Sequence, residues 1–411
     1  MVIIGILFFI FGFVTWLNGS LIPFLKVILD LSDFEALFVT FAFYIAYTVM
    51  ALPMAYVLDR TGYKNGMSLG LVVMSVGSLL FIPAALNAEY YLFLIALFTL
   101  GTGLTLLQTA SNPYIVLIGP LESAAMRISI MGLINKSAGV LAPLVFTAII
   151  FSGIGSIDAL TDEDVSNLAN KLILPYLIMA MALAALAVFV KLSSLEEVIY
   201  QKDEYDDTCI FSFTRVVLGA IALFFYVGIE VIAGDTIGLY AQGLGVVDAT
   251  SLTSYTMVFM VISYLVGVFF IPKYLSQQKA LTGSAILGIT LLIGVAFTST
   301  TSHSFSEILW GWSGVMTLPN SVTFVALLGL ANALVWPTIW PLALEDLGAH
   351  TAKGSALLIM AIAGGALLPL VFGSIAELSG DMQGSYLFGI ICYLIILFYA
   401  LKGHKMNSWK L

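Results

Sequence analysis

Two carboxylates lie in the otherwise apolar stretch YVGIEVIAGDTIGLYA, residues 226–241. They are Glu230 and Asp235, and the nearest basic residues along the chain are Arg215 and Lys273. A carboxylate in such surroundings can take up a proton or ligate Na⁺ while it accepts hydrogen bonds from a polar ligand. We therefore predict an ion-coupling site at Glu230 and Asp235, with Na⁺ as the only metal that either acid would bind.

An ideal helix separates Glu230 from Asp235 by about 140°, so the two acids do not share a face. Glycines near them would let the helix bend or unwind, which could bring both acids to one cavity. These are Gly228, Gly234 and Gly238. The alternative role for Glu230 is a structural ion pair with Lys136.

A lysine and an asparagine interrupt another apolar run in the motif INKSAG, which contains Asn135 and Lys136. Lys136 lies about 13 Å along a helix from Arg127, which is too deep for its ammonium to reach the membrane surface easily. Gly132 and Gly139 leave open space beside its stem. Glu230 is its natural partner, and the pair could be static or could break during a functional cycle. We predict that Asn135 and Lys136 contact substrate.

Amides form a second group of candidate ligands. Gln108 and Asn112 are four residues apart in LLQTASNPYIVLIGP and share a helix face, and Pro113 interrupts the helix after them. Amides both donate and accept hydrogen bonds, which suits a hydroxyl-rich ligand, although they could instead tie neighbouring helices together. Asn18, in GFVTWLNGSLIP, is a candidate of the same kind.

Asn332, Trp336 and Trp340 recur every four residues in LANALVWPTIWPLALEDLG. A tryptophan face can stack on the apolar side of a sugar ring, and an asparagine can bond the hydroxyls of that ring. We predict that Asn332 and Trp336 contact substrate. The alternative is helix packing or an aromatic belt, which suits Trp340 better because it lies nearer the end of its span.

These residues stand in a chain that is 61% hydrophobic and 9% charged over 411 residues, a composition typical of a polytopic membrane protein. The first apolar run begins at Met1 without a basic leader or a clear cleavage site, so we predict a helix and not a signal peptide. Apolar runs of about 20 residues cross a bilayer as helices. Twelve are predicted, at 2–27, 34–58, 65–86, 90–118, 125–152, 171–192, 213–240, 250–275, 279–300, 320–343, 355–377 and 382–401.

The basic residues orient these spans. If both termini are cytoplasmic, most of the 15 Lys and Arg side chains fall in cytoplasmic loops or helix ends, whereas Lys26 and Lys171 fall outside and Lys136 lies within a span. The positive-inside rule therefore predicts cytoplasmic termini.

The chain also divides into similar halves. AGVLAPLVF at 138–146 resembles GGALLPLVF at 364–372, and the same spacing aligns Arg127 with Lys353. Parallel six-helix halves around a central site are a known transporter architecture. We predict a six-helix N-terminal half at 1–192, a cytoplasmic linker at 193–212, a six-helix C-terminal half at 213–401 and a cytoplasmic tail at 402–411.

Asp59 and Arg60 lie at the tight turn of AYVLDRTGYKNG, residues 55–66, where we predict a charge-paired conformational latch that does not contact substrate.

Several classes of function are excluded. There is no basic stripe for nucleic acid, no phosphate-binding glycine loop with a lysine for ATP, and no cofactor motif. The cysteines, Cys209 and Cys392, are too few for a disulfide framework or a metal cluster. Energy would then come from an ion gradient or from the substrate gradient.

Five ordered motifs give the chain a specific resemblance. VLDRTGYKNG is similar to the signature between the second and third helices of the major facilitator superfamily, with Ala55 where a glycine is usual. WLNGSLIPFLK, LQTASNPYIVLIGP, RISIMGLINKSAGVLAPLVF, EVIAGDTIGLYA and WPTIWPLALEDLG resemble the fucose:proton symporter family, in its glucose/galactose transporter branch. The resemblance covers nearly the whole chain.

That resemblance implies an all-α fold of two pseudo-symmetric six-helix halves and sugar–cation symport by alternating access. In the fucose permease branch, an aspartate follows the asparagine of the first span and a glutamate precedes the Thr-Ala-x-Asn-Pro of the fourth. This chain has Gly19 and Gln108 at those positions, whereas Asn135 matches the family's fifth-span asparagine. We therefore hypothesise that the coupling acid has moved to Glu230, assisted by Asp235.

The sequence thus predicts an importer of a glucose- or galactose-type hexose in a bacterial inner membrane, coupled to H⁺ or Na⁺, with no obligate protein partner. N-acetylglucosamine, mannose or fucose are alternative substrates, and an uncoupled uniporter or an exporter is an alternative mode. A sugar sensor is a further alternative. An intramembrane enzyme is disfavoured because the spans offer no nucleophile or metal cluster.

Overall fold

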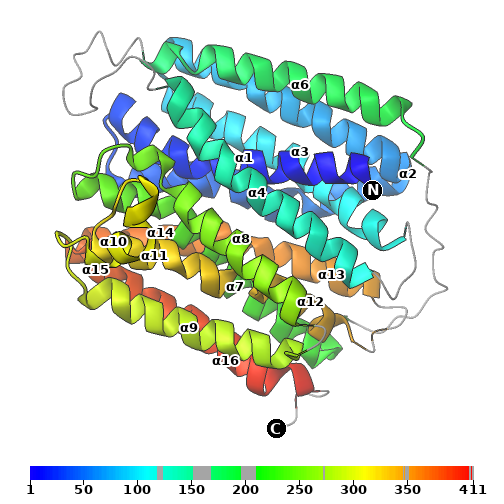
Figure 1. Cartoon of the computed structure of the whole chain (residues 1–411). Helices are drawn as coiled ribbons and strands as arrows, with labels where there is room; N and C mark the ends of the chain where they lie inside the picture. Colours follow the sequence, from blue (N-terminus) through cyan, green and yellow to red (C-terminus); the bar gives the residue numbers. More distant parts are fainter. Residues whose placement is uncertain are drawn as a thin grey trace.

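The structure is a computed structural model that describes residues 1–117, 124–150, 168–195, 210–271, 274–345, 347, 351–406 and 409. Within these ranges all regular structure is helical. Long helices lie side by side in one bundle, with those of residues 1–192 forming one layer and those of residues 214–401 the other (Figure 1). Cys209 and the acidic part of the predicted linker lie outside the described residues.

The described residues contain 12 helices that are long and apolar enough to cross a membrane, so the prediction of twelve spans is confirmed. They cover Val2–Ile28, Asp33–Ala51, Arg60–Asn87, Tyr90–Asn112, Arg127–Ile150, Leu168–Leu192, Thr214–Gly243, Ala249–Phe270, Gln277–Phe297, Asn320–Leu344, Leu357–Ser379 and Met382–Lys405. Large apolar side chains such as Phe189, Ile262 and Ile391 are exposed on the outside of the bundle, as expected for surfaces that face lipid.

The first layer holds α1 (Val2–Ile28), α2 (Asp33–Asn87), α3 (Tyr90–Leu117), α4 (Ala124–Ile150) and α6 (Ile173–Leu192). α2 consists of two helices, one for each span, which meet at a sharp kink at Gly62, where the backbone is not helical and the φ of 75° is readily adopted by glycine. A capping box of Ser32 and Glu35 starts α2. α3 runs on to Leu117, so Pro113 does not end the helix as the sequence suggested.

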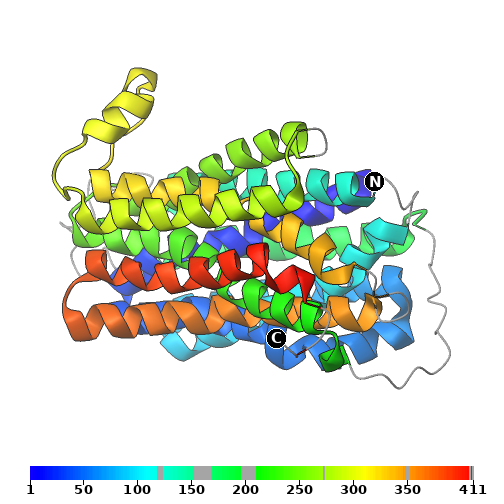
Figure 2. The same cartoon turned by 90° about the horizontal axis from the view of Figure 1, so that it is seen from below.

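The second layer begins with α7 (Thr214–Gly243), α8 (Thr253–Phe270) and α9 (Gln277–Phe297). The remaining spans are built from shorter pieces. They are α11 (Asn320–Asn332) with α12 (Val335–Leu344), α13 (Thr351–Met360) with α14 (Gly364–Ser379), and α15 (Met382–Ser385) with α16 (Gly389–Leu401). A hairpin with the short helix α10 (Ser304–Trp310) projects sideways from the end of this layer (Figure 2).

Proline chemistry accounts for one of these breaks. α11 ends at Asn332 and α12 begins at Val335, so Pro337 falls in the first turn of α12. Proline is tolerated there because the first N–H groups of a helix have no partner within the helix, whereas in mid-helix it would break a hydrogen bond. The predicted stripe of Asn332, Trp336 and Trp340 is therefore divided between two helices.

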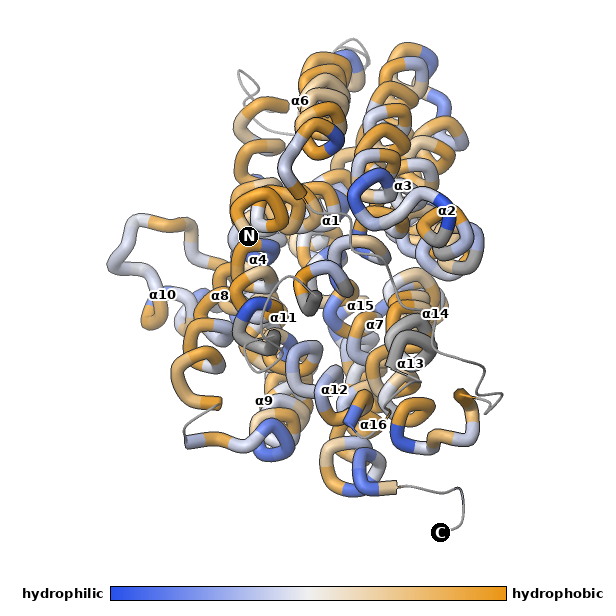
Figure 3. Tube along the Cα trace, turned by 90° about the vertical axis from the view of Figure 1, so that its right-hand side faces the viewer, coloured by the Kyte–Doolittle hydropathy of each residue, from blue (hydrophilic) through white to orange (hydrophobic). Residues whose placement is uncertain are grey.

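The two layers repeat one packing scheme. α4 packs along α1 in the first layer, and α14 packs along α7 in the second. In each case a glycine meets the backbone of the neighbouring helix. A Cβ at Gly12 would collide with the carbonyl of Asn135, and one at Gly364 would collide with the carbonyl of Phe224. Seen along the bundle, the helices form an upper and a lower group of similar size (Figure 3). This arrangement confirms the predicted fold of two pseudo-symmetric halves.

Candidate functional site

An ion pair joins the two halves of the bundle. The ammonium of Lys136 in α4 lies 2.7 Å from Oε1 of Glu230 in α7, and both side chains are about nine-tenths buried. The sequence suggested this partnership from the depth of the two residues alone. A buried charge that loses its partner is costly, so the contact ties the N-terminal half to the C-terminal half at this level.

Trp16 of α1 lies beside this pair. The ammonium of Lys136 stands 4.4 Å from the centre of the Trp16 ring, a cation–π distance. The ring of Trp16 packs against Gly139 of α4 and Gly234 of α7. A Cβ atom at either glycine would collide with the ring, so both positions need a residue without a side chain. Trp16 was not among the predicted ligands, although it lies two residues before Asn18, which was.

Two buried donors on α1 have no hydrogen-bond partner among the described residues. They are the indole nitrogen of Trp16 and the amide nitrogen of Asn18, and both side chains are almost fully buried. Unpaired buried donors are rare because each loses its hydrogen bonds to water without replacement. A ligand that accepts hydrogen bonds, such as a hydroxyl-rich molecule, would satisfy them.

Asp235 takes a different partner from Glu230. The hydroxyl of Thr40 in α2 donates to its Oδ2 at 3.1 Å, and its Oδ1 has no partner among the described residues. α7 is one unbroken helix from Thr214 to Gly243, so the two acids are not brought to one cavity by unwinding. Its glycines instead allow close packing, with Gly228 against Leu368.

The predicted amides are distributed around the first half. The amide nitrogen of Gln108 in α3 donates to the hydroxyl of Tyr47 in α2 at 2.9 Å. The amide nitrogen of Asn135 donates to the carbonyl of Phe8 at 3.3 Å. Asn112 is half-buried. Gln108 and Asn135 therefore also link helices, which was the alternative role stated for such amides.

In the second half, Asn332 is fully buried and its carbonyl oxygen accepts from the hydroxyl of Tyr393 at 2.7 Å. Trp336 and Trp340 are half-buried, and their rings lie 5.6 Å apart between centroids. The ring centroids of Trp336 and Tyr226 are 6.3 Å apart. Tyr226 lies on α7, one turn before Glu230. A row of aromatic rings thus leads from the end of α12 toward the buried ion pair.

At the predicted latch, the side chain of Asp59 lies outside the described residues. Arg60 is exposed, and its guanidinium lies over the ring of Tyr56, 4.2 Å from the ring centre. No group of His, Cys, Asp and Glu with the arrangement of a metal site occurs in the described part of the chain.

Among the described residues, several hydrogen bonds between the halves join sequence positions that fall at the end of the bundle opposite the N-terminus. Ser20, near the end of α1, donates to the carbonyl of Thr250, and Thr147, near the end of α4, lies 2.9 Å from the Thr250 hydroxyl. Ser254 donates to the carbonyl of Val140 at 2.7 Å. Together with Thr40 and Asp235, these contacts hold the halves together at the end opposite the N-terminus.

The described residues form twelve helices that are long and apolar enough to cross a membrane, in two repeated halves with a buried polar site between them. This arrangement defines a membrane transporter of the rocking two-domain kind. The Major Facilitator Superfamily profile matches residues 4–368. The chain belongs to this superfamily, whose members are transporters and not enzymes.

Full-length relatives refine this assignment. The chain is 36% identical to the glucose/galactose transporter of Brucella abortus biovar 1 (strain 9-941), over 97% of this chain and 93% of that protein. It is 26% identical to the L-fucose-proton symporter of Escherichia coli (strain K12), over 96% of this chain and 90% of that protein. Among solved structures it resembles FucP in the outward conformation, with a TM-score of 0.71, 25% identity and 97% of each chain covered. The family resemblance stated from the motifs is thus confirmed.

Proposed function

We propose that the protein imports a hexose of the glucose or galactose type by alternating access, driven by the entry of a cation. The relatives named glucose/galactose transporter support the substrate class, because the identity extends over nearly the whole chain. The site supports it independently, since it combines unpaired donors, amides and aromatic faces, which together suit a ring bearing hydroxyls.

The observation that carries the coupling proposal is the ion pair between Lys136 and Glu230. A proton that binds to Glu230 removes the negative charge from the pair and so weakens the contact between the halves. The released ammonium of Lys136 can then donate to a sugar hydroxyl. In this scheme proton binding and sugar binding favour the same rearrangement, which is the requirement for coupled transport.

We propose H⁺ as the coupling ion. The relatives named L-fucose-proton symporter support this choice. Gly19 and Gln108 offer no carboxylate at the positions where the resemblance leads one to expect acids, so Glu230 would carry the proton. Asp235, whose Oδ1 is unpaired among the described residues, is the second proposed coupling residue.

The conformation of this structure fits one step of the cycle. Contacts at Ser20, Thr40, Thr147 and Ser254 hold the halves together at the end opposite the N-terminus. With both termini in the cytoplasm, as the basic residues predict, that end is the outer one. Sugar would then leave toward the cytoplasm past Asn112 and Trp336, and the turn at Asp59 and Arg60 would latch the opposite state.

We propose that the protein lies in the inner membrane of a bacterium, with a six-helix half at 1–192, a linker at 193–212, a second half at 213–401 and a tail at 402–411. A single chain would suffice, because both halves of the site come from it. The substrate ligands proposed from the sequence are Asn18, Gln108, Asn112, Asn135, Lys136, Asn332 and Trp336. Trp16 is added to them because its indole nitrogen has no partner among the described residues.

The test is uptake of labelled glucose into proteoliposomes that hold the purified protein. One set has an inward proton gradient, another an inward sodium gradient, and a third neither. We expect accumulation above equilibrium under the proton gradient alone. Accumulation driven by sodium would transfer the coupling role to that ion, and equilibration at one rate in all sets would identify a uniporter. Galactose, mannose, fucose and N-acetylglucosamine, added as competitors, define the specificity.

A further inference from the structure

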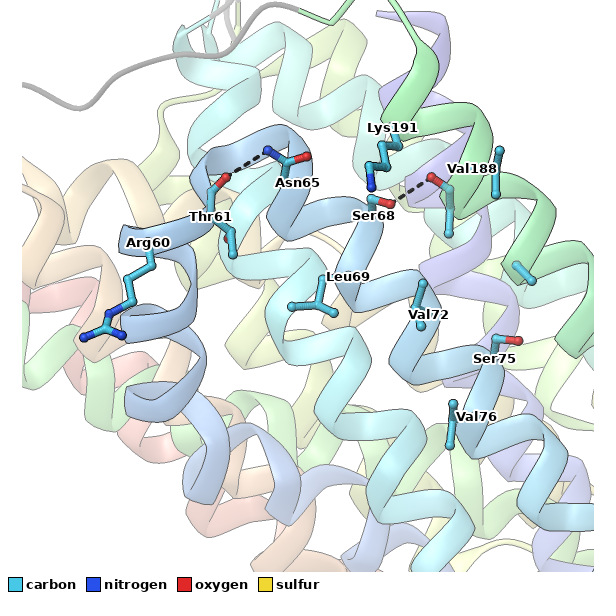
Figure 4. A pocket seen from close by; sticks show the side chains of 12 residues that line it. Arg60, Thr61, Asn65, Ser68, Leu69, Val72, Ser75, Val76, Val188 and Lys191 are labelled. Carbon is cyan, nitrogen blue, oxygen red and sulfur yellow. Dashed lines mark hydrogen bonds between the residues drawn. The ribbon is translucent and has the colours of Figure 1, made fainter.

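A groove of about 720 Å³ lies on the flank of the first half (Figure 4). The residues that line it are different from those of the candidate sugar site. It runs between α2, from the turn just before the kink at Gly62 onward, and α6. The residues that line it are Arg60, Thr61, Asn65, Ser68, Leu69, Val72, Ser75, Val76, Ala184, Ala187, Val188 and Lys191.

The lining changes from charged to apolar along the groove. On α2, Arg60, Thr61 and Asn65 lie in the turns next to the kink, and Leu69, Val72 and Val76 follow along the helix. α6 runs in the opposite direction, so its apolar residues Ala184 and Val188 come first and the charged Lys191 comes last, near the end of the helix. The charged end therefore lies at the membrane face that holds the N-terminus, and the apolar end lies within the bilayer.

Hydrogen bonds between the two helices fix the shape of this groove. The hydroxyl of Ser68 donates to the carbonyl of Ala187 at 2.8 Å, as drawn in Figure 4, and that of Ser75 donates to the carbonyl of Ala180 at 2.7 Å. Near the charged end of the groove, the ammonium of Lys64 donates to the carbonyl of Ser193 at 2.6 Å and so links α2 to the residue after α6. The serine hydroxyls are thus engaged between helices, and the groove is held open by the packing of α2 on α6.

The two cations of the groove are presented to an outside partner. Arg60 and Lys191 are exposed, and no carboxylate lines the groove among the residues that the structure describes. Arg60 rests on the ring of Tyr56 one turn earlier, which directs the guanidinium without neutralising its charge. An ammonium binds a phosphate as a point charge, and a nearby guanidinium adds to the positive potential that attracts the anion.

We propose that this groove binds an anionic phospholipid. Lys191 holds the headgroup phosphate, and Arg60 adds a second positive charge at the same membrane face. Thr61 and Asn65 lie beside the glycerol region, and an acyl chain follows Leu69, Val72 and Val76. The order of charged, polar and apolar residues along the groove is the order of these parts in the lipid. Basic pockets between membrane helices are known to take anionic headgroups.

The site would fasten α2 to α6 at the face where the proposed latch operates. The lipid would thereby favour one arrangement of the first half. This consequence rests on the proposed transport function, whereas lipid binding itself does not. The experiment below therefore measures binding and not transport.

The test is native mass spectrometry of the full-length protein in detergent with added phosphatidylglycerol, compared with phosphatidylcholine. We expect selective retention of phosphatidylglycerol by the unaltered chain. Each basic residue near an anionic lipid contributes about fivefold in affinity. The Arg60→Gln/Lys191→Gln variant should therefore lose about thirtyfold in apparent affinity.

A matched control is Lys279→Gln/Lys402→Gln, which removes two exposed lysines elsewhere and should retain the lipid as the unaltered chain does. A second variant, Ala184→Leu, keeps both charges but narrows the apolar part of the groove, and should weaken retention several-fold. Equal retention of both lipids by the unaltered chain overturns the proposal, and so does retention of phosphatidylglycerol by Arg60→Gln/Lys191→Gln at the level of the control.

Discussion

The ammonium of Lys136 and Oε1 of Glu230 stand 2.7 Å apart across the boundary between the two halves of the bundle. They are 94 residues apart in the chain. Each half supplies one charge, so any rocking of one half against the other must either carry this pair along or break it. We treat the pair as the point at which ion binding acts on conformation.

Glu230→Gln tests the coupling role directly. The amide keeps the size and polarity of the side chain but cannot take up a proton, so gradient-driven accumulation of sugar should be abolished. Exchange of labelled for unlabelled sugar should continue, because exchange needs no net proton movement. Both are measured in proteoliposomes, with Glu307→Gln on the exposed helix α10 as the control. Normal accumulation by Glu230→Gln would remove Glu230 from the coupling site.

Lys136→Met should destabilise the protein, because it leaves Glu230 as a buried charge without its partner. The expected cost is about 3–5 kcal/mol. The double variant Lys136→Met/Glu230→Leu should recover most of the lost stability, since it leaves neither charge behind, yet it should not restore accumulation. Thermal unfolding in detergent measures the first effect and uptake measures the second. A double variant as unstable as Lys136→Met would mean that the loss reflects packing and not charge.

Trp16→Phe should weaken sugar binding. Phenylalanine keeps an aromatic face near Lys136 but removes the indole N–H, which lacks a partner among the described residues. The loss of one hydrogen bond corresponds to about a three- to tenfold rise in KM. The kcat should stay within about twofold, because binding and not turnover is affected. Trp312→Phe, on the exposed hairpin, is the matched control, and equal KM values for the two variants would exclude Trp16 as a ligand.

Thr40→Val removes the hydroxyl that donates to Asp235 and so weakens the contacts at the end that we propose to be the outer one. A lost hydrogen bond of about 1 kcal/mol shifts the balance of closed and open forms about fivefold toward the open form. The shift can be measured as faster labelling of Ser20→Cys by an impermeant thiol reagent, in a chain with Cys209 and Cys392 replaced by alanine. Thr40→Ser keeps the hydroxyl and should label at the original rate. Identical rates in Thr40→Val and Thr40→Ser would show that this bond does not hold the outer end closed.

The sequence by itself determined the twelve spans, because lipid requires each backbone segment to satisfy its own hydrogen bonds. The length and composition of a run such as Thr214–Gly243 therefore suffice to define a helix. It also identified Glu230 and Lys136 as partners, since two isolated charges at membrane depth have few other choices. The similarity of AGVLAPLVF and GGALLPLVF indicated two repeated halves. Two halves that pack their helices in the same way need small residues at the same positions.

Only the tertiary structure decided which other groups meet. The glycines near Glu230 and Asp235 suggested that an unwound helix could bring both acids to one cavity, but α7 stays helical and Asp235 meets Thr40, 195 residues away. Trp16 was overlooked because its importance depends on Gly139 and Gly234, which come from different halves and meet only when the bundle closes. The direction in which a side chain points follows from helix geometry, but the neighbour that it reaches depends on how helices distant in the chain pack together.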